Sequence, residues 1–167
     1  MEVKDDKTVA IIKEETCQGH RFCYDFSVNN IAVRQTWPFK KTFETHCKVL
    51  PTSWSFEMLF QYLPDNGNVS CYMTLGRTDT MNIPVKAVIW LRFSTANYQP
   101  YFVLPKIISE DRMLPNDEIK ESLLEILPFS EVGTSFNEEV IVAVVIRIRH
   151  CHSKTDKDPV ATTNTDT

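Results

Sequence analysis

The chain has 167 residues, a length typical of one domain, and 43% of its residues are hydrophobic, enough for one core. Its formal net charge of −4 argues against a general phosphate-binding surface, so we expect no nucleic-acid partner. No apolar run approaches the ~20 residues that span a bilayer, and the charged start lacks a signal-peptide core. We therefore expect a cytoplasmic or nuclear protein with no membrane partner, and the five cysteines fit reduced thiols.

The composition divides the chain into three parts. Residues 1–7 are charged and are predicted to be loose, and residues 8–150 are predicted to form a single domain. The last stretch is rich in Thr, Asp and Lys and poor in apolar residues, which is typical of disorder. We therefore expect residues 151–167 to be a disordered tail or a linker.

The first half of the domain is predicted to contain strands at 8–13, 21–28, 46–50 and 53–63. Large apolar side chains alternate in the last of these: Trp54, Phe56, Met58, Phe60 and Tyr62. This period of two predicts a strand with one apolar face. Pro64 and the pair Asn66-Gly67 then favour a hairpin turn into a strand at 69–75. On that strand Tyr72 falls on the polar face.

The second half is predicted to add strands at 85–93, 101–104 and 140–149. The last of these is rich in β-branched residues and is apolar on both faces at its start, as in a central strand. One short helix is expected near 117–127, capped by Asn116 or Asp117 and ended by Pro128. Its apolar face would consist of Ile119, Leu123, Leu124 and Leu127. About seven or eight strands with one short helix predict an all-β fold, an antiparallel β-sandwich.

Several segments resemble, in order and spacing, those of the MATH (TRAF-homology) domain family. They are 24–31 (YDFSVNNI), 54–67 (WSFEMLFQYLPDNG), 69–75 (VSCYMTL), 85–87 (VKA) and 136–140 (FNEEV). The resemblance covers roughly residues 21–149 and is closest to the speckle-type POZ-like proteins. We expect this chain to lack the POZ (BTB) domain that follows in those proteins.

This resemblance implies a TRAF-like sandwich that binds short extended peptides in a shallow groove. The expected function is a protein–protein interaction module whose ligands are segments of partner proteins. Among these partners we expect ubiquitin-ligase substrates, which the module would recognise or compete for in cullin-based ubiquitination. We expect no enzymatic activity and no cofactor, because the sequence lacks a Gly-rich phosphate loop and a suitably placed nucleophile and base.

Four residues are predicted to bind the peptide. By the resemblance, Tyr72 matches a groove tyrosine, Ile89 matches a groove phenylalanine, and Tyr101 supplies a further groove tyrosine. The prediction for Trp90 rests on the pattern of its own strand. A tryptophan between two basic residues on the outward face is a good binding anchor. Alternatives stay open: Tyr72 as a scattered surface aromatic, Ile89 as core, and Trp90 as covered by a loop or second layer.

Two further functions are considered. The first is an oligomeric structural TRAF-like module, although no heptad repeat precedes the domain. The second is a zinc-binding β-sandwich protein, since Cys17, His20 and Cys23 could supply three ligands, with His46 or Cys47 as a fourth.

A second group of metal-ligating residue types lies near the end of the domain. His150, Cys151 and His152 are consecutive, and neighbouring residues on a strand point to opposite faces, which hinders joint ligation. From the sequence we therefore expect no metal ligand. An immunoglobulin-like sandwich also stays open, although no Cys…Trp…Cys pattern occurs at domain spacing.

Overall fold

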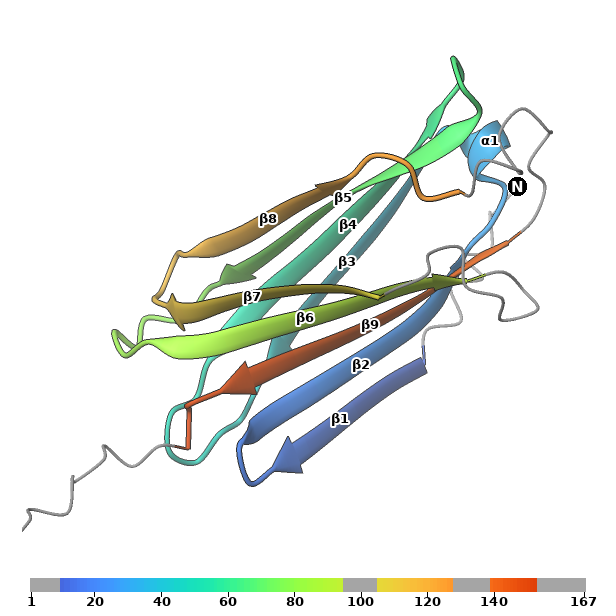
Figure 1. Ribbon diagram of the computed structural model, residues 1–167. Coiled ribbons are helices and arrows are strands. Elements are labelled where there is room, and N and C mark those ends of the chain that lie inside the picture. Colours follow the sequence, from blue (N-terminus) through green and yellow to red (C-terminus); the bar gives the residue numbers. More distant parts are fainter. Residues whose placement is uncertain (1–9, 95–104, 128–138, 153–167) are drawn as a thin grey trace, which may run out of the picture.

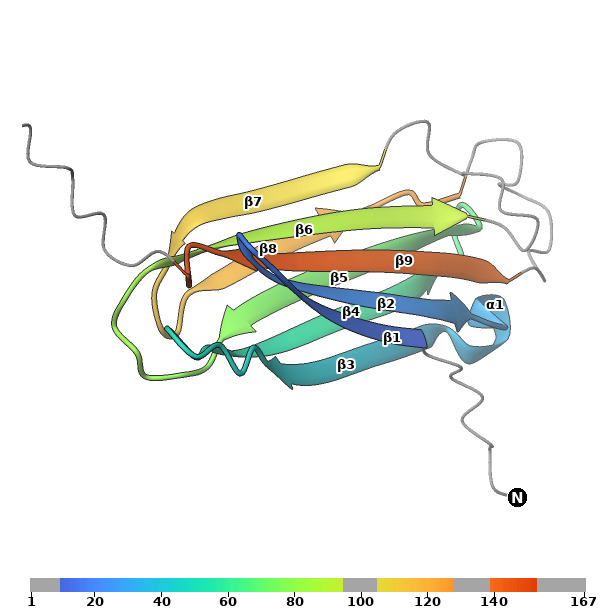
Figure 2. The same cartoon turned by 90° about the horizontal axis from the view of Figure 1, so that it is seen from below.

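The computed structural model describes residues 10–94, 105–127 and 139–152, which form two antiparallel β-sheets packed face to face (Figure 1, Figure 2). Sheet A has the strand order β1-β2-β9-β6-β7, and sheet B has the order β3-β4-β5-β8. Every described strand pairing is antiparallel. The predicted all-β sandwich is confirmed.

The strand bounds place residues from both ends of the chain in sheet A. Sheet A consists of β1 (Ala10–Thr16), β2 (Gly19–Val28), β9 (Val140–Arg149), β6 (Val85–Ser94) and β7 (Lys106–Met113). Sheet B consists of β3 (Thr36–Glu44), β4 (Ser53–Leu63), β5 (Asn68–Arg77) and β8 (Glu118–Leu123). Helix α1 (Ile31–Arg34) joins β2 to β3. Within the described ranges, no helix has the length and hydropathy needed to cross a bilayer.

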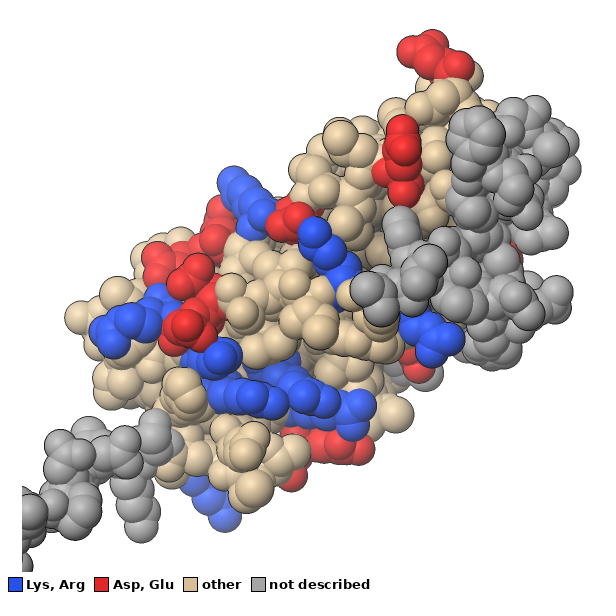
Figure 3. All heavy atoms as spheres, viewed as in Figure 1, with Lys and Arg blue, Asp and Glu red and all other residues tan. Residues whose placement is uncertain are grey.

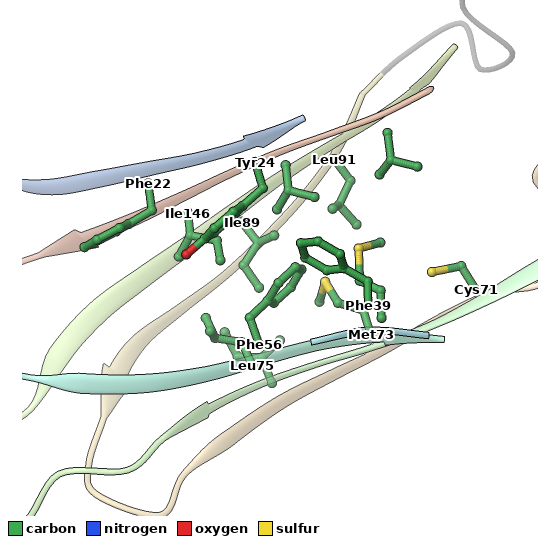
Figure 4. Packing of buried hydrophobic residues seen from close by; sticks show 14 of the residues in the cluster. Phe22, Tyr24, Phe39, Phe56, Cys71, Met73, Leu75, Ile89, Leu91 and Ile146 are labelled. Atoms are coloured by element: carbon green, nitrogen blue, oxygen red, sulfur yellow. The ribbon is translucent and has the colours of Figure 1, made fainter. Parts of the chain in front are cut away.

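The core lies between the two sheets, where alternate side chains of each strand meet. Figure 4 shows Phe22 and Tyr24 of sheet A directed toward Phe39 and Phe56 of sheet B. The rings of Tyr24 and Phe56 stack with centroids 6.4 Å apart. Burying one such aromatic side chain contributes about 1.5–3 kcal/mol. The inward faces of the two sheets therefore form the core and are not available to partners.

The helix predicted near 117–127 is wrong, because residues 118–123 form strand β8. Asp117 accepts a hydrogen bond from the Leu114 N–H (2.8 Å), and Asn116 has a φ of 70°, so this segment is a tight turn. Ile119 and Leu123 are four apart, a spacing that fits one face of a strand as well as one face of a helix. Pairing with β5 decides between them, and Leu124, expected on the helical face, is 62% exposed.

Besides β8, two described strands were not predicted, and one predicted strand is absent. Strand β3 was missed because Pro38 interrupts its alternation, but Pro is tolerated here since β3 is an edge strand. Strand β7 was missed because it is charged and mostly exposed. Residues 46–50 form a loop, not a strand, and His46 has a φ of 50°. The strand predicted at 101–104 lies outside the described residues.

Candidate functional site

The structure places the four predicted peptide-binding residues in different environments. Tyr72 is 43% exposed on the outer face of sheet B, whereas Trp90 is partly exposed on the outer face of sheet A. These two faces lie on opposite sides of the sandwich, so Tyr72 and Trp90 do not share a groove. Tyr101 lies outside the described residues.

Ile89 is fully buried, with an exposed fraction of 0%, and the prediction that it contacts a peptide is therefore wrong. It points into the core in phase with Ala87 and Leu91, which are equally buried. The resemblance paired Ile89 with a groove residue by position along the strand. Because side chains alternate along the strand, Ile89 is directed inward, which agrees with the alternative that Ile89 is a core residue.

Trp90 sits in an apolar row that crosses sheet A. The strand register places Val145 of β9 on one side of Trp90 and Ile107 of β7 on the other. Ile107 is 64% exposed, which confirms that the row faces outward. A shallow hollow of about 260 Å³ lies here, lined by Arg21, Val88, Trp90, Ile107, Val145 and Arg147. We call these residues the Trp90 surface.

Two arginines flank the apolar floor of the Trp90 surface. Arg21 and Arg147 are register partners on β2 and β9, and Arg21 forms an ion pair with Glu14 at 3.2 Å. Within the part of the chain that the structure describes, no carboxylate lies within ion-pairing distance of Arg147 or of the neighbouring Arg149. Figure 3 shows Lys and Arg side chains gathered in a band across this face. The face is basic although the chain as a whole carries a charge of −4.

The outer face of sheet B, which carries Tyr72, differs in its charges. Lys40 pairs with Glu57 at 2.9 Å, and Lys120 pairs with Glu118 at 3.2 Å. Both of these lysines are thus already matched by carboxylates. The Trp90 surface is therefore the better candidate for a binding site, because it combines a partly exposed tryptophan with an arginine that lacks an ion-pair partner among the described residues.

A second site lies at one end of the sandwich, where four metal-ligating side chains converge. Figure 1 shows the β1–β2 turn, the β3–β4 loop and the end of β9 meeting at this end. These segments bring together His20, Cys47, Cys151 and His152, whose ligand atoms all lie within 4.8 Å of one another. We call these residues the Cys/His cluster.

The Cys/His cluster combines residues from both groups of possible metal ligands identified in the sequence. His20 comes from the first pattern, whose Cys17 and Cys23 stay outside the cluster, and Cys151 and His152 come from the second. Cys151 is only 1% exposed, so the packed chain continues beyond the predicted domain boundary at residue 150. The chain turns directly after β9, which removes the strand geometry that would have separated Cys151 from His152.

The surroundings of His20 and Cys151 favour the uncharged forms of these two side chains. Burial, followed by the neighbouring His152, lowers the pKa of His20 below its ordinary value, although Glu15 opposes the shift. Burial, followed by the neighbouring Cys47, raises the pKa of Cys151 to about 12. At neutral pH the imidazole of His20 is therefore neutral, the form of histidine that binds metals.

Comparison with known proteins adds no family assignment. The chain matches no protein-family model, and no curated protein matches it in sequence.

Proposed function

We propose that this β-sandwich is a protein–protein interaction module whose Trp90 surface binds short acidic segments of partner proteins. The observation that carries the proposal is Arg147, which is exposed beside the apolar floor formed by Trp90 and its neighbours and has no described carboxylate partner. Tryptophan and arginine are the residue types that most often dominate the binding energy of protein interfaces.

The chemistry of the hollow defines the class of ligand. A guanidinium group can bind a carboxylate through two parallel hydrogen bonds, which favours Asp or Glu side chains over neutral ones. The apolar floor can bury an aliphatic or aromatic side chain at the same time. The ligand that fits is an extended peptide in which an acidic and an apolar residue lie two positions apart, since such side chains are directed to the same side of a strand and can meet Arg147 and the apolar floor together.

The resemblance to MATH domains supports the same class of function. With it we propose that the bound segments belong to ubiquitin-ligase substrates, which the module recognises or competes for in cullin-based ubiquitination, in the cytoplasm or nucleus. This role requires binding alone and no catalysis by the module itself.

The proposal predicts a large loss of affinity when the anchor is truncated. Trp90→Ala should weaken binding of a synthetic peptide that carries Glu and Leu two positions apart by about 10- to 100-fold, because a central tryptophan anchor is worth roughly 2 kcal/mol or more. Arg147→Glu should weaken it at least about tenfold by placing like charges together. Isothermal titration calorimetry on the full chain measures both. A peptide with Lys in place of Glu should bind wild type poorly.

Matched controls lie on the opposite face. Tyr72→Ala removes a partly exposed aromatic from sheet B, and Lys40→Glu reverses a charge there, so neither should change peptide affinity. Equal binding of the Glu and Lys peptides, or unchanged affinity in Trp90→Ala, would rule out the proposed site. A single-stranded oligonucleotide that displaces the peptide would point to a nucleic-acid ligand instead. Self-association that Trp90→Ala abolishes would favour the oligomeric structural module.

A further inference from the structure

We propose that His20, Cys47, Cys151 and His152 form a tetrahedral zinc site that joins the two sheets at one end of the sandwich. The proposal is independent of the Trp90 surface, which lies on the outer face of sheet A. It rests on the convergence of four ligand atoms from three separate segments of the chain.

The donor set and the spacing fit Zn²⁺. Two thiolates and two imidazoles are a common structural zinc combination, and the thiolates balance the ion's charge. Zn–N bonds of about 2.0–2.1 Å and Zn–S bonds of about 2.3 Å require ligand atoms roughly 3.3–3.8 Å apart in a tetrahedron. The two imidazole Nε2 atoms are 3.1 Å apart, and every other ligand pair lies within 4.8 Å. Shifts of about 1 Å or less would complete the geometry.

The backbone positions these ligands before any ion binds. The loop that carries Cys47 is closed by hydrogen bonds between Thr45 and Thr52, including Thr52 N–H to Thr45 Oγ1 at 3.0 Å. The Cys47 thiol donates to the carbonyl oxygen of Cys151 at 3.8 Å, and this contact holds the loop against the chain that follows β9. Loop and chain are therefore already in place, which lowers the ordering cost of binding.

Burial favours a structural site over a catalytic one. His20, Cys47 and Cys151 are buried, and the side chain of His152 is 21% exposed, so four protein ligands would enclose the ion. A catalytic zinc keeps one position open for water or substrate, and this cluster fills all four positions from the protein. Glu15 lies 3.5 Å from His152 Nε2, but its side chain is 66% exposed and the two thiolates already neutralise the ion.

The position of the site gives it a structural role. His20 is the second residue of β2 in sheet A, Cys47 belongs to the loop that connects β3 to β4 in sheet B, and Cys151 follows β9. An ion bound there ties the end of β9 to both sheets. A ligand that binds only the folded state raises the midpoint of thermal unfolding.

Metal content and cobalt spectroscopy test the site on the full chain. Protein purified with a reductant, stripped by a chelator and titrated with Zn²⁺ should take up one equivalent, measured by mass spectrometry of the metal. Co²⁺ in its place should give the intense visible absorption of tetrahedral thiolate coordination. Cys47→Ser and His152→Ala should each weaken Zn²⁺ binding about 100-fold or more, since even the loss of an outer-shell partner costs about 10–100-fold.

The chain supplies matched controls for both substitutions. Cys23→Ser changes another buried cysteine, and His150→Ala changes a histidine two positions from His152, and both should retain wild-type affinity. Zinc should raise the melting temperature of wild type and of these controls but not of Cys47→Ser. This readout stays informative if a variant is less stable, because each protein is compared with and without zinc.

Three results would overturn the site. One is the absence of zinc uptake and cobalt absorption in reduced wild type. Another is uptake that survives both Cys47→Ser and His152→Ala. The third is a disulfide between Cys47 and Cys151 in the purified protein, with no zinc binding after its reduction. The two sulfur atoms would then form a covalent cross-link and would not be zinc ligands.

Discussion

Replacing Arg77 with methionine is expected to destabilise the protein by about 3–5 kcal/mol, because it leaves the carboxylate of Asp79, whose side chain is only 10% exposed, without its charged partner. The Arg77 side chain is fully buried, and its Nε and Nη2 each donate to Asp79 at 3.0 Å. Its Nη1 donates to the carbonyl oxygens of Ile83 and Met113, both at 2.6 Å, and Nη2 donates to that of Met81 at 2.7 Å. Removing the guanidinium takes a charged donor away from each of these acceptors, and Asp79 keeps only its bonds from the N–H groups of Ser53 and Met81.

Arg77 also joins the two sheets, which explains why the expected effect is large. It ends β5 in sheet B, and Met113 ends β7 in sheet A. Urea denaturation measures the loss. Lys40→Met is the matched control, since Lys40 pairs with Glu57 at the surface and its removal should change stability by less than about 1 kcal/mol. A change of similar size in the two variants would contradict this role for Arg77.

The same pair predicts a dependence of stability on pH. Burial alone would raise the pKa of Asp79, but hydrogen bonds from Arg77 and from the N–H groups of Ser53 and Met81 outweigh it and lower the pKa below 3.8. A carboxyl group with a depressed folded pKa stabilises the protein fully above its unfolded pKa. This contribution is lost as the pH falls below about 4 and through the lower folded value. In Arg77→Met the acid-induced loss of stability measured by urea denaturation should be smaller than in wild type.

Gly19→Ala is expected to destabilise the protein by about 2–5 kcal/mol, combining steric overlap and backbone strain. A Cβ at this position would lie 1.9 Å from the carbonyl oxygen of Ile148, and φ is 151°, a conformation that glycine adopts readily and other residues rarely do. Relief requires separating β2 from β9 at the Gly19–Arg149 pair. Thermal unfolding monitored by circular dichroism measures the loss.

Gly76→Ala provides the matched control for this substitution. A Cβ at Gly76 would meet Glu118 Cγ at 3.6 Å, an ordinary van der Waals contact. The change should therefore be within about 1 kcal/mol of neutral, since alanine also restricts the unfolded chain. If Gly19→Ala unfolds at the same temperature as wild type, β2 and β9 do not approach as closely as the contact between Gly19 and Ile148 requires.

The sequence predicts those strands whose hydrophobic pattern fits only one type of secondary structure. Strict alternation of large apolar residues occurs in β4 and β6, and both strands appear within one residue of the expected bounds. The helix predicted at 117–127 is wrong because the spacing of Ile119 and Leu123 fits the period of a helix and the period of a strand equally well. Only the pairing with β5 shows that the segment is a strand. Strand β3 could not be predicted, because Pro38 has a low propensity for strands. Its pairing with β4 is possible because β3 lies at the edge of the sheet.

The candidate sites are less predictable, because they depend on register between distant strands. Trp90 was identified from its own strand, but Arg147 becomes its neighbour only through the pairing of β9 with β6. The Cys/His cluster is divided between two local patterns, and each pattern alone is incomplete. Spacing along the chain signals a metal site only when the ligands share a segment, and here they come from three.

The measurement that tests the central claim most directly is the NMR spectrum of the tryptophan indole N–H groups during titration with the acidic peptide. The protein has three tryptophans, and Trp37 and Trp54 are buried with exposed fractions of 2% and 1%. If the Trp90 surface binds the peptide, only the Trp90 indole signal should shift in proportion to bound peptide. Binding that leaves the Trp90 signal unchanged would contradict the account and place the interaction on another surface.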